Sequence, residues 1–206
     1  IGKENISYVL KEDITMSKKT IVNVSKDFGD LAKHPNIKKI AENTFTISKN
    51  IELNKNFYIK KNQNFIIGNN VVIKLFDNSI LFIKGDIKFN GTSDKKILVK
   101  SDGTGSIIFE NNNVEISNTN FENLGYPKLD QYTLFGGLNF IKSSVILENL
   151  TIKDSKSEDA INLINSDTSL ENIYLENIQS DAIDIDFGSV KFNKIYCLKI
   201  KNDCLD

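Results

Sequence analysis

Residues 145–152 read VILENLTI, and two related stretches follow, TSLENIYL at 168–175 and VKFNKIYC at 190–197. The repeat length is about 22–23 residues, in the range of solenoid proteins. Aligned, the stretches place apolar or small side chains in four columns: Val145/Thr168/Val190, Leu147/Leu170/Phe192, Leu150/Ile173/Ile195 and Ile152/Leu175/Cys197. Alternating apolar positions in such a repeat predict a coil of stacked β-strands whose columns line a common interior.

One polar residue, Asn149, Asn172 or Lys194, precedes the third column of each stretch. Asn tolerates the left-handed backbone conformation better than most residues, and this conformation allows a sharp change of chain direction. We therefore expect a tight bend between two short strands at these three positions.

The same alternation extends back to residue 45. Apolar residues occur there in pairs two positions apart, and each pair predicts a three-residue strand with two inward side chains. The pairs are Phe45/Ile47, Ile51/Leu53, Phe57/Ile59, Phe65/Ile67, Ile73/Leu75, Leu81/Ile83, Ile87/Phe89, Ile97/Val99, Ile107/Phe109 and Val114/Ile116. We predict an all-β solenoid with three strands per coil over residues 45–206.

Residues 1–44 are predicted to form an N-terminal cap segment with a short helix. Ser25 can cap such a helix, Pro35 interrupts it, and NIKKIAE at 36–42 can form another turn or two. We expect this helix to cover the open end of the coil, because an exposed strand edge promotes aggregation.

Residues 124–138, LGYPKLDQYTLFGGL, interrupt the repeat and predict an outward loop. Its aromatic residues Tyr126, Tyr132 and Phe135 are able to stack on sugar rings. Packing of these side chains against the coil is the favoured interpretation, and Tyr126 and Tyr132 are retained as candidate carbohydrate-binding residues.

Composition excludes several classes of function. The net charge of −1 over 206 residues gives no basic face for nucleic acid. All 26 basic residues are Lys, so no guanidinium is present to clamp a carboxylate or phosphate. The single His34 precedes Pro35 and cannot build a His-rich metal site. No apolar run is long enough to predict a membrane span.

The two cysteines match no zinc-binding spacing. Cys197 takes an apolar column position and is interpreted as a small core residue, while a Cys197–Cys204 disulfide is the alternative if the protein is exported.

The sequence begins at Ile1 and stops within a repeat, so we expect further domains of the same chain and a truncated C-terminus.

Acidic residues recur with the same period. SEDAINL at 157–163, SDAIDID at 180–186 and NDCLD at 202–206 align. The alignment places Asp159, Asp181 and Asp203 in one column where the chain turns into a strand, and predicts that Asn162, Asp184, Asp186 and Asp206 face outward.

Two interpretations of the acid columns remain open. Carboxylates stacked about 4.8 Å apart tend to acquire raised pKa values or to recruit a cation. Asp159, Asp181 and Asp203 are therefore candidate metal ligands, with calcium as the candidate ion. The alternative is structural, because an Asp at a turn can accept hydrogen bonds from nearby backbone N–H groups.

Two motifs within residues 68–125 carry a family resemblance. GDIKFNGT at 85–92 fits a G-x-I-x-x-x-G-T turn, and ILVKS at 97–101 fits an I-x-F-x-S strand with Val99 in place of Phe. Together with SDAIDIDFGSVKFNKI at 180–195, they resemble the right-handed parallel β-helix (pectin-lyase-like) superfamily over residues 45–206. The resemblance implies a right-handed parallel β-helix on which sugars lie across the outside of one parallel sheet, and we expect the strands at 159–163 and 181–186 to belong to that sheet.

The resemblance leaves the activity open, because the superfamily includes lyases, hydrolases, epimerases, adhesins and tailspikes. Similarity to polygalacturonases makes Asp181 and Asp203 the candidate catalytic acids, but Asn202 replaces one of the paired aspartates and the G-H-G and R-I-K segments are absent. A calcium-dependent lyase would need a Lys as its base. Lys153, Lys156 and Lys201 lie in adjacent turns.

We therefore expect a domain that binds or processes polysaccharide. Asn162, Asp184, Asp186 and Asp206 are its candidate carbohydrate ligands, and we expect it outside the cytoplasm, in an extracellular, cell-surface or periplasmic protein. The alternatives are a glycoside hydrolase or calcium-dependent polysaccharide lyase, and a structural stalk or adhesin.

Overall fold

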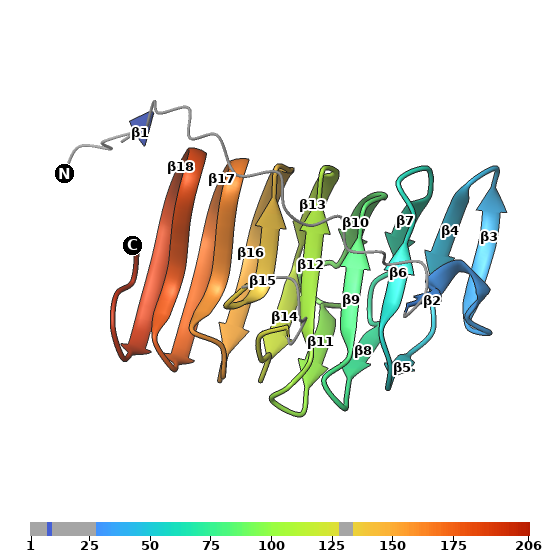
Figure 1. Cartoon of the computed structure of the whole chain (residues 1–206), viewed down its shortest axis with the longest axis horizontal. Coiled ribbons are helices and arrows are strands. Elements are labelled where there is room, and N and C mark those ends of the chain that lie inside the picture. Colours follow the sequence, from blue (N-terminus) through green and yellow to red (C-terminus); the bar gives the residue numbers. More distant parts are fainter. Residues whose placement is uncertain (1–7, 10–27, 128–133) are drawn as a thin grey trace.

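The computed structural model describes residues 8–9, 28–127 and 134–206. Within them the chain winds into a parallel β-solenoid of about seven turns, as predicted from the repeat. Figure 1 shows the coils side by side along the long axis, in sequence order from blue β3 and β4 to red β18; among the described strands only β1 departs from this order and lies at the β18 end. Three faces run along the solenoid, each of them a ladder of strands from successive coils.

Face A begins at the N-terminal end with β4 and continues through the first part of β16 and the middle of β17 and β18. Its strands are β4 (Thr44–Ile47), β7 (Asn64–Ile67), β10 (Asp86–Asn90), β13 (Asn113–Ser117), β16 (Ser144–Lys153), β17 (Asp159–Ile178) and β18 (Asp181–Ile200).

Face B follows face A in every coil and contains the later parts of β16, β17 and β18. Its separate strands are β5 (Ile51–Leu53), β8 (Val72–Leu75), β11 (Ile97–Ser101) and β14 (Thr119–Glu122). Face C closes the coil and contains the first parts of β17 and β18. Its separate strands are β2 (Gly29–Asp30), β6 (Phe57–Ile59), β9 (Ile80–Ile83), β12 (Ser106–Glu110) and β15 (Gly136–Ile141).

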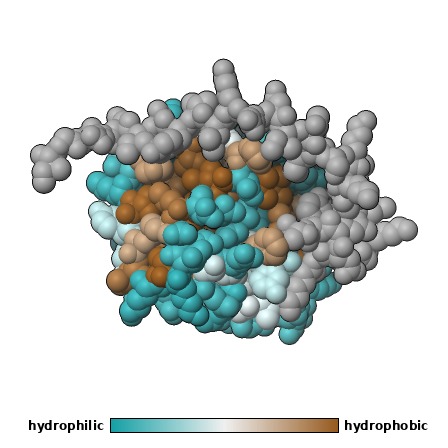
Figure 2. Space-filling view, turned by 60° about the vertical axis from the view of Figure 1, so that its left-hand side comes forward, coloured by the Kyte–Doolittle hydropathy of each residue, from teal (hydrophilic) through white to brown (hydrophobic). Residues whose placement is uncertain are grey.

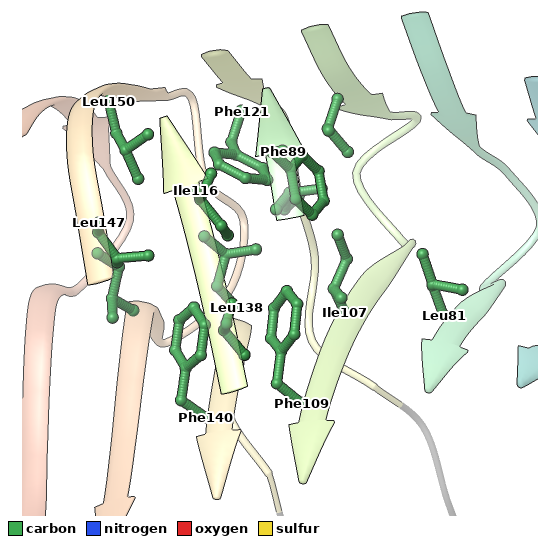
Figure 3. Close-up of a cluster of buried hydrophobic side chains, with 14 of the residues drawn as sticks. Leu81, Phe89, Ile107, Phe109, Ile116, Phe121, Leu138, Phe140, Leu147 and Leu150 are labelled. Atoms are coloured by element: carbon green, nitrogen blue, oxygen red, sulfur yellow. The ribbon is translucent and has the colours of Figure 1, made fainter. Parts of the chain in front are cut away.

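The interior is filled by the predicted columns. Val145, Thr168 and Val190 are register partners, as are Leu147, Leu170 and Phe192. Of the predicted inward pairs from residue 45 to 116, all side chains are buried except that of Phe45, which is half-buried. Figure 3 shows how the larger side chains stack between coils; the rings of Phe109 and Phe140 lie 4.6 Å apart and nearly parallel.

The faces are joined at corners where one residue adopts a left-handed conformation. At the corner between faces A and B these residues include Asn149, Asn172 and Lys194, with φ angles of 54°, 56° and 59°. The predicted bends are thereby confirmed. The other two corners use the same device, at Asn111, Lys142, Asn165 and Phe187 between faces C and A, and at Asn123, Asp154, Asn177 and Lys199 after face B.

The predicted helical cap is not seen among the described residues, apart from one short 3-10 turn before Pro35; residues 25–27 lie outside them. Residues Ile37–Ala41 form a strand, β3, antiparallel to β4. The edge of β4 offers unpaired backbone groups, and β3 satisfies them as a helix could not. The preceding turn is a short 3-10 helix (η1, Leu31–Lys33), whose buried Leu31 packs against the first coil.

The opposite end of the solenoid is more open. Several inward side chains of β18, among them Phe192 and Ile195, are only partly buried, although Ile183 is fully buried. Figure 2, turned to bring this end forward, shows apolar residues gathered there beside polar ones. A short strand, β1 (Tyr8–Val9), pairs antiparallel with β18 at Ser189 and Val190.

Cys197 and Cys204 form a disulfide across this end. The favoured interpretation of Cys197 as a free core residue is therefore wrong, although its position does lie against the core. Residues 203–206 are not a regular strand but lie along the face C edge of β18, where the Asp206 N–H donates to Ile183 O at 3.0 Å. Within the described ranges, no helix has the length and apolar character needed to cross a membrane.

The corner geometry can be tested at Asn172, whose side-chain N–H donates to Asn149 Oδ1 at 2.7 Å. Asn172→Val should destabilise the solenoid, because a left-handed conformation costs a residue with Cβ about 1–2 kcal/mol and the lost hydrogen bond about 1 kcal/mol more. The urea midpoint followed by circular dichroism measures the effect.

Asn172→Gly is the matched control, because Gly adopts the left-handed conformation without strain. It should lower the midpoint less than Val does. Equal losses for Val and Gly would show that the backbone conformation is not what makes Asn172 important.

Candidate functional site

The outward residues of face C form one continuous column along the solenoid. Asn162 is the register partner of Asp184, and backbone hydrogen bonds place Asp206 next to Asp184. The predicted stacking of Asn162, Asp184 and Asp206 is thus confirmed. Towards the N-terminal end the same column continues through Asn139, Ile108, Phe82 and Tyr58.

The N-terminal half of this outer face is apolar, which the sequence analysis did not anticipate. Phe82 and Ile108 are almost fully buried although they point away from the solenoid interior. They belong to a second, smaller apolar cluster with Ile80, Leu134 and Ile141. The polar part of face C is therefore limited to the C-terminal coils. We call Asp159, Asn162, Asp184, Asp186 and Asp206 the acidic wall.

Asp159 is the most perturbed group of the acidic wall. The residue is 4% exposed and its Oδ2 accepts a hydrogen bond from Asn162 Nδ2 at 3.0 Å. Burial, followed by the nearby Asp184 carboxylate, raises the pKa of Asp159 to about 7. Asp159 can therefore hold a proton near neutral pH, as few carboxyl groups do.

Asn162 is 3% exposed, and its Oδ1 has no hydrogen-bond partner. Asn139, one coil earlier, differs because its side chain is satisfied; Nδ2 donates to Gly136 O at 2.7 Å and Oδ1 accepts from the Gly136 N–H at 3.1 Å. A buried acceptor without a partner gives up its hydrogen bonds to water on folding and gains none in the protein, which costs free energy. Asn162 is thus the exceptional amide of this column.

Asp184 lies one coil further and is half-buried. Burial raises its pKa to about 6, and the carboxylates of Asp186 and Asp206 contribute in the same direction. Asp186 and Asp206 are exposed. The acidic wall therefore changes from buried side chains at Asp159 and Asn162 to solvent-accessible ones at its C-terminal end.

Asp181 has a structural role. Its Oδ1 accepts hydrogen bonds from the Asp203 N–H at 2.9 Å and from Asn202 Nδ2 at 2.8 Å, so it ties one coil to the next. The described residues contain no group of three His, Cys, Asp or Glu side chains able to hold a metal ion. Asp159, Asp181 and Asp203 share a register column but do not converge as a three-acid ligand set.

Lys153, one of the possible lyase bases, is engaged elsewhere. It lies on face B, where its Nζ is 2.8 Å from a carboxylate oxygen of Glu176 and sits over the Tyr174 ring.

Tyr126 and Phe135 are each 42% exposed, so the expected packing of these rings against the coil is incomplete. Tyr132 lies outside the described residues.

A groove that sequence reasoning missed runs along the corner between faces C and A. Its volume is about 760 Å³, and polar or charged residues line it throughout. Lys61, Lys84, Asn111, Lys142 and Asn165 lie along its face C side. Asp86, Asn113, Ser144 and Asp167 lie along its face A side. We call this feature the corner groove.

The floor of the corner groove is held by buried hydrogen bonds. Asn112 and Ser143 are buried, and the Ser143 hydroxyl donates to Asn112 Oδ1 at 2.8 Å. Asn112 Nδ2 in turn donates to Gly85 O at 2.9 Å. The sequence signal for the groove was a polar position repeated between the face C and face A strands, but sequence alone could not show that the corner is concave.

The corner groove and the acidic wall adjoin each other. Ile164 is the register partner of Asp186, and Asn165, the next residue after Ile164, lines the groove. A ligand that lies along the groove towards the C-terminal end therefore approaches Asp186 and Asp184.

Comparisons with family models, with curated proteins and with solved structures find no match to this chain. The functional argument therefore rests on the geometry of the groove and the wall.

The pKa of Asp159 predicts how stability depends on pH. Between its ordinary value of 3.8 and about 7, the folded protein keeps the proton and the unfolded chain loses it. The free energy of unfolding should therefore fall as the pH rises through this range. Asp184 contributes with the same sign.

Asp159→Asn removes the ionisable group and preserves its size. The variant should match the wild type near pH 4 and exceed it above pH 7, by roughly 1–4 kcal/mol. Urea unfolding at several pH values measures the difference. A difference that is constant with pH would show that Asp159 does not retain its proton in the folded state.

Proposed function

We propose that this solenoid is a polysaccharide-binding domain of the right-handed parallel β-helix (pectin-lyase-like) kind, which acts outside the cytoplasm. The corner groove is the observation that carries the proposal. Binding sites are typically concave, with volumes of about 300–1,000 Å³, and the groove falls in this range at about 760 Å³. Its all-polar lining suits a ligand covered with hydroxyl groups and disfavours an apolar one.

The shape of the groove favours a chain rather than a single sugar. Its lining residues come from successive coils, which are spaced about 4.8 Å apart. This spacing is comparable with the length of one sugar ring, so a glycan lying along the solenoid meets a similar set of donors and acceptors in each coil. Lys and Asn side chains on one side and carboxylates on the other give the bound chain a preferred orientation.

The proposed location rests on the disulfide. Disulfides persist in oxidising compartments and are rare in the cytosol. The Cys197–Cys204 bond closes the last described coil, where the inward side chains are least protected from solvent. A covalent cross-link at this end would stabilise the coil in a secreted or surface protein, where disulfides persist.

A hydrolase is a second candidate, favoured by Asp159 and Asp184. Glycoside hydrolysis uses one carboxyl group that retains its proton and another that is ionised. The raised pKa of Asp159 suits the first role. In this interpretation Asp159 and Asp184 replace Asp181 and Asp203 as the catalytic candidates, because Asp181 is committed to hydrogen bonds between coils.

Filling the groove tests the proposal. Ser144 is exposed and lines the groove, so Ser144→Phe should block a glycan that lies there and lower affinity by about 10-fold or more, the equivalent of losing one or two hydrogen bonds to the sugar. A glycan array identifies a ligand for the wild type, and titration calorimetry then compares the variant.

Ile146→Phe is the matched control, because Ile146 is an exposed residue on the same strand and the same face but lies outside the groove lining. It should bind like the wild type. If both variants keep full affinity, the groove is not the binding site.

The acidic wall is tested by replacing Asp184 and Asp206 together with Asn. Both side chains reach solvent, and relief of the carboxylate repulsion offsets other losses, so the melting temperature should stay the same or rise. Glycan affinity should fall, and release of reducing ends should stop if the domain is a hydrolase. Unchanged affinity and turnover would remove the wall from the site.

A further inference from the structure

The acidic wall presents hydrogen-bond acceptors and negative charge. Once Asp159 has lost the proton that it holds near neutral pH, the carboxylates of the wall only accept hydrogen bonds, and the free group of Asn162, its Oδ1, is also an acceptor. None of the ion pairs formed among the described residues includes Asp159, Asp184 or Asp186. The carboxylates of the wall are therefore not neutralised by the lysines of the described chain.

The unpartnered Asn162 oxygen points to a missing donor. The Asn162 amide is held by its Nδ2 bond to Asp159 and stands directly beside Asp184 in the register. Its Oδ1 is therefore a buried acceptor on a side chain that contacts Asp159 and lies one coil from Asp184. Leaving such an acceptor without a donor is costly, and a ligand that supplies a donor removes the cost.

The chemistry of these acceptors selects the ligand. An ammonium group carries three N–H donors and a positive charge, whereas a uronate adds a further negative charge to the wall. We propose that the acidic wall binds polysaccharides that carry free amino groups, with a sugar ammonium bound against the half-buried Asp184, next to Asp159 and Asn162. This inference rests on the proposed glycan-binding function and specifies its substrate class.

Binding of a cation should also displace protons. The two carboxyl groups have pKa values of about 7 and about 6. A bound ammonium favours their ionised forms, so part of the proton population on Asp159 and Asp184 leaves when the ligand binds. A neutral sugar that only forms hydrogen bonds gives no such release.

The experiment is titration calorimetry with a β-1,4-linked glucosamine oligomer and its fully N-acetylated counterpart, at about pH 5, where the sugar amine is charged and Asp159 and Asp184 still hold most of their protons. The two ligands differ only in the amine. The glucosamine oligomer should bind about 10-fold or more tightly than the acetylated one, as expected for a charge-assisted contact. Its enthalpy should differ between two buffers of unlike ionisation enthalpy, which reports proton release.

The Asp159→Asn, Asp184→Asn double variant should lose both the preference for the amine and the buffer dependence, while keeping any residual binding in the corner groove. Asp94→Asn, in an exposed turn of a distant coil, should behave like the wild type.

Equal affinity for the two oligomers would overturn this inference. Binding of acidic or neutral glycans alone would do the same, but would leave the proposed function standing. Binding of no glycan at all would remove both. Glycan binding that appears only with added calcium and survives acetylation would identify a metal-bridged site and overturn the ammonium assignment.

Discussion

The solenoid depends on corners that each turn the chain with a single left-handed residue. Because the change of direction at such a corner needs only a single residue, three short strands and their bends fit in one repeat of about 22 residues. It also fixes register, since Asn149 and Asn172 occupy the same corner of successive coils and are hydrogen-bonded to each other. A shift by one residue would move the left-handed conformation onto a neighbour such as Glu171 or Ile173, which tolerates it less well than Asn, and would turn every inward side chain outward.

Fixed register is also what creates the surface features. Because each coil places equivalent residues beside one another, a polar turn position becomes a groove and an outward strand position becomes a wall. The corner groove arises where positions such as Asn111 and Lys142 follow face C strands, above buried Asn112 and Ser143. The column of face C, in contrast, changes character along its length, from buried Phe82 and Ile108 to the acids of the C-terminal coils.

The features of the fold that could be predicted from the sequence are those that repeat with the coil. The inward columns and the bends at Asn149, Asn172 and Lys194 could be predicted because period-two apolarity and left-handed tolerance are local properties of the residues. The strand at Ile37–Ala41 could not, because its conformation is decided by the neighbouring edge of β4 and not by its own alternation. The disulfide required knowledge of how residues 203–206 fold back onto the coil.

The candidate site, like the fold, was only partly predictable from the sequence. The sequence placed Asn162, Asp184 and Asp206 in one outward column without distinguishing their burial. It made Asp159 and Asp181 alike candidate metal ligands, with Asp181 also a candidate catalytic acid. The structure separates these two acids by their partners. Asp181 accepts a backbone N–H from the next coil and is thereby compensated for its burial. Asp159 accepts only an amide N–H and lies against another carboxyl group, so it retains its proton near neutral pH. Similar motifs thus acquire different chemistry from the residues that surround them, so one position of a structural repeat can differ in protonation from its counterpart in the next coil.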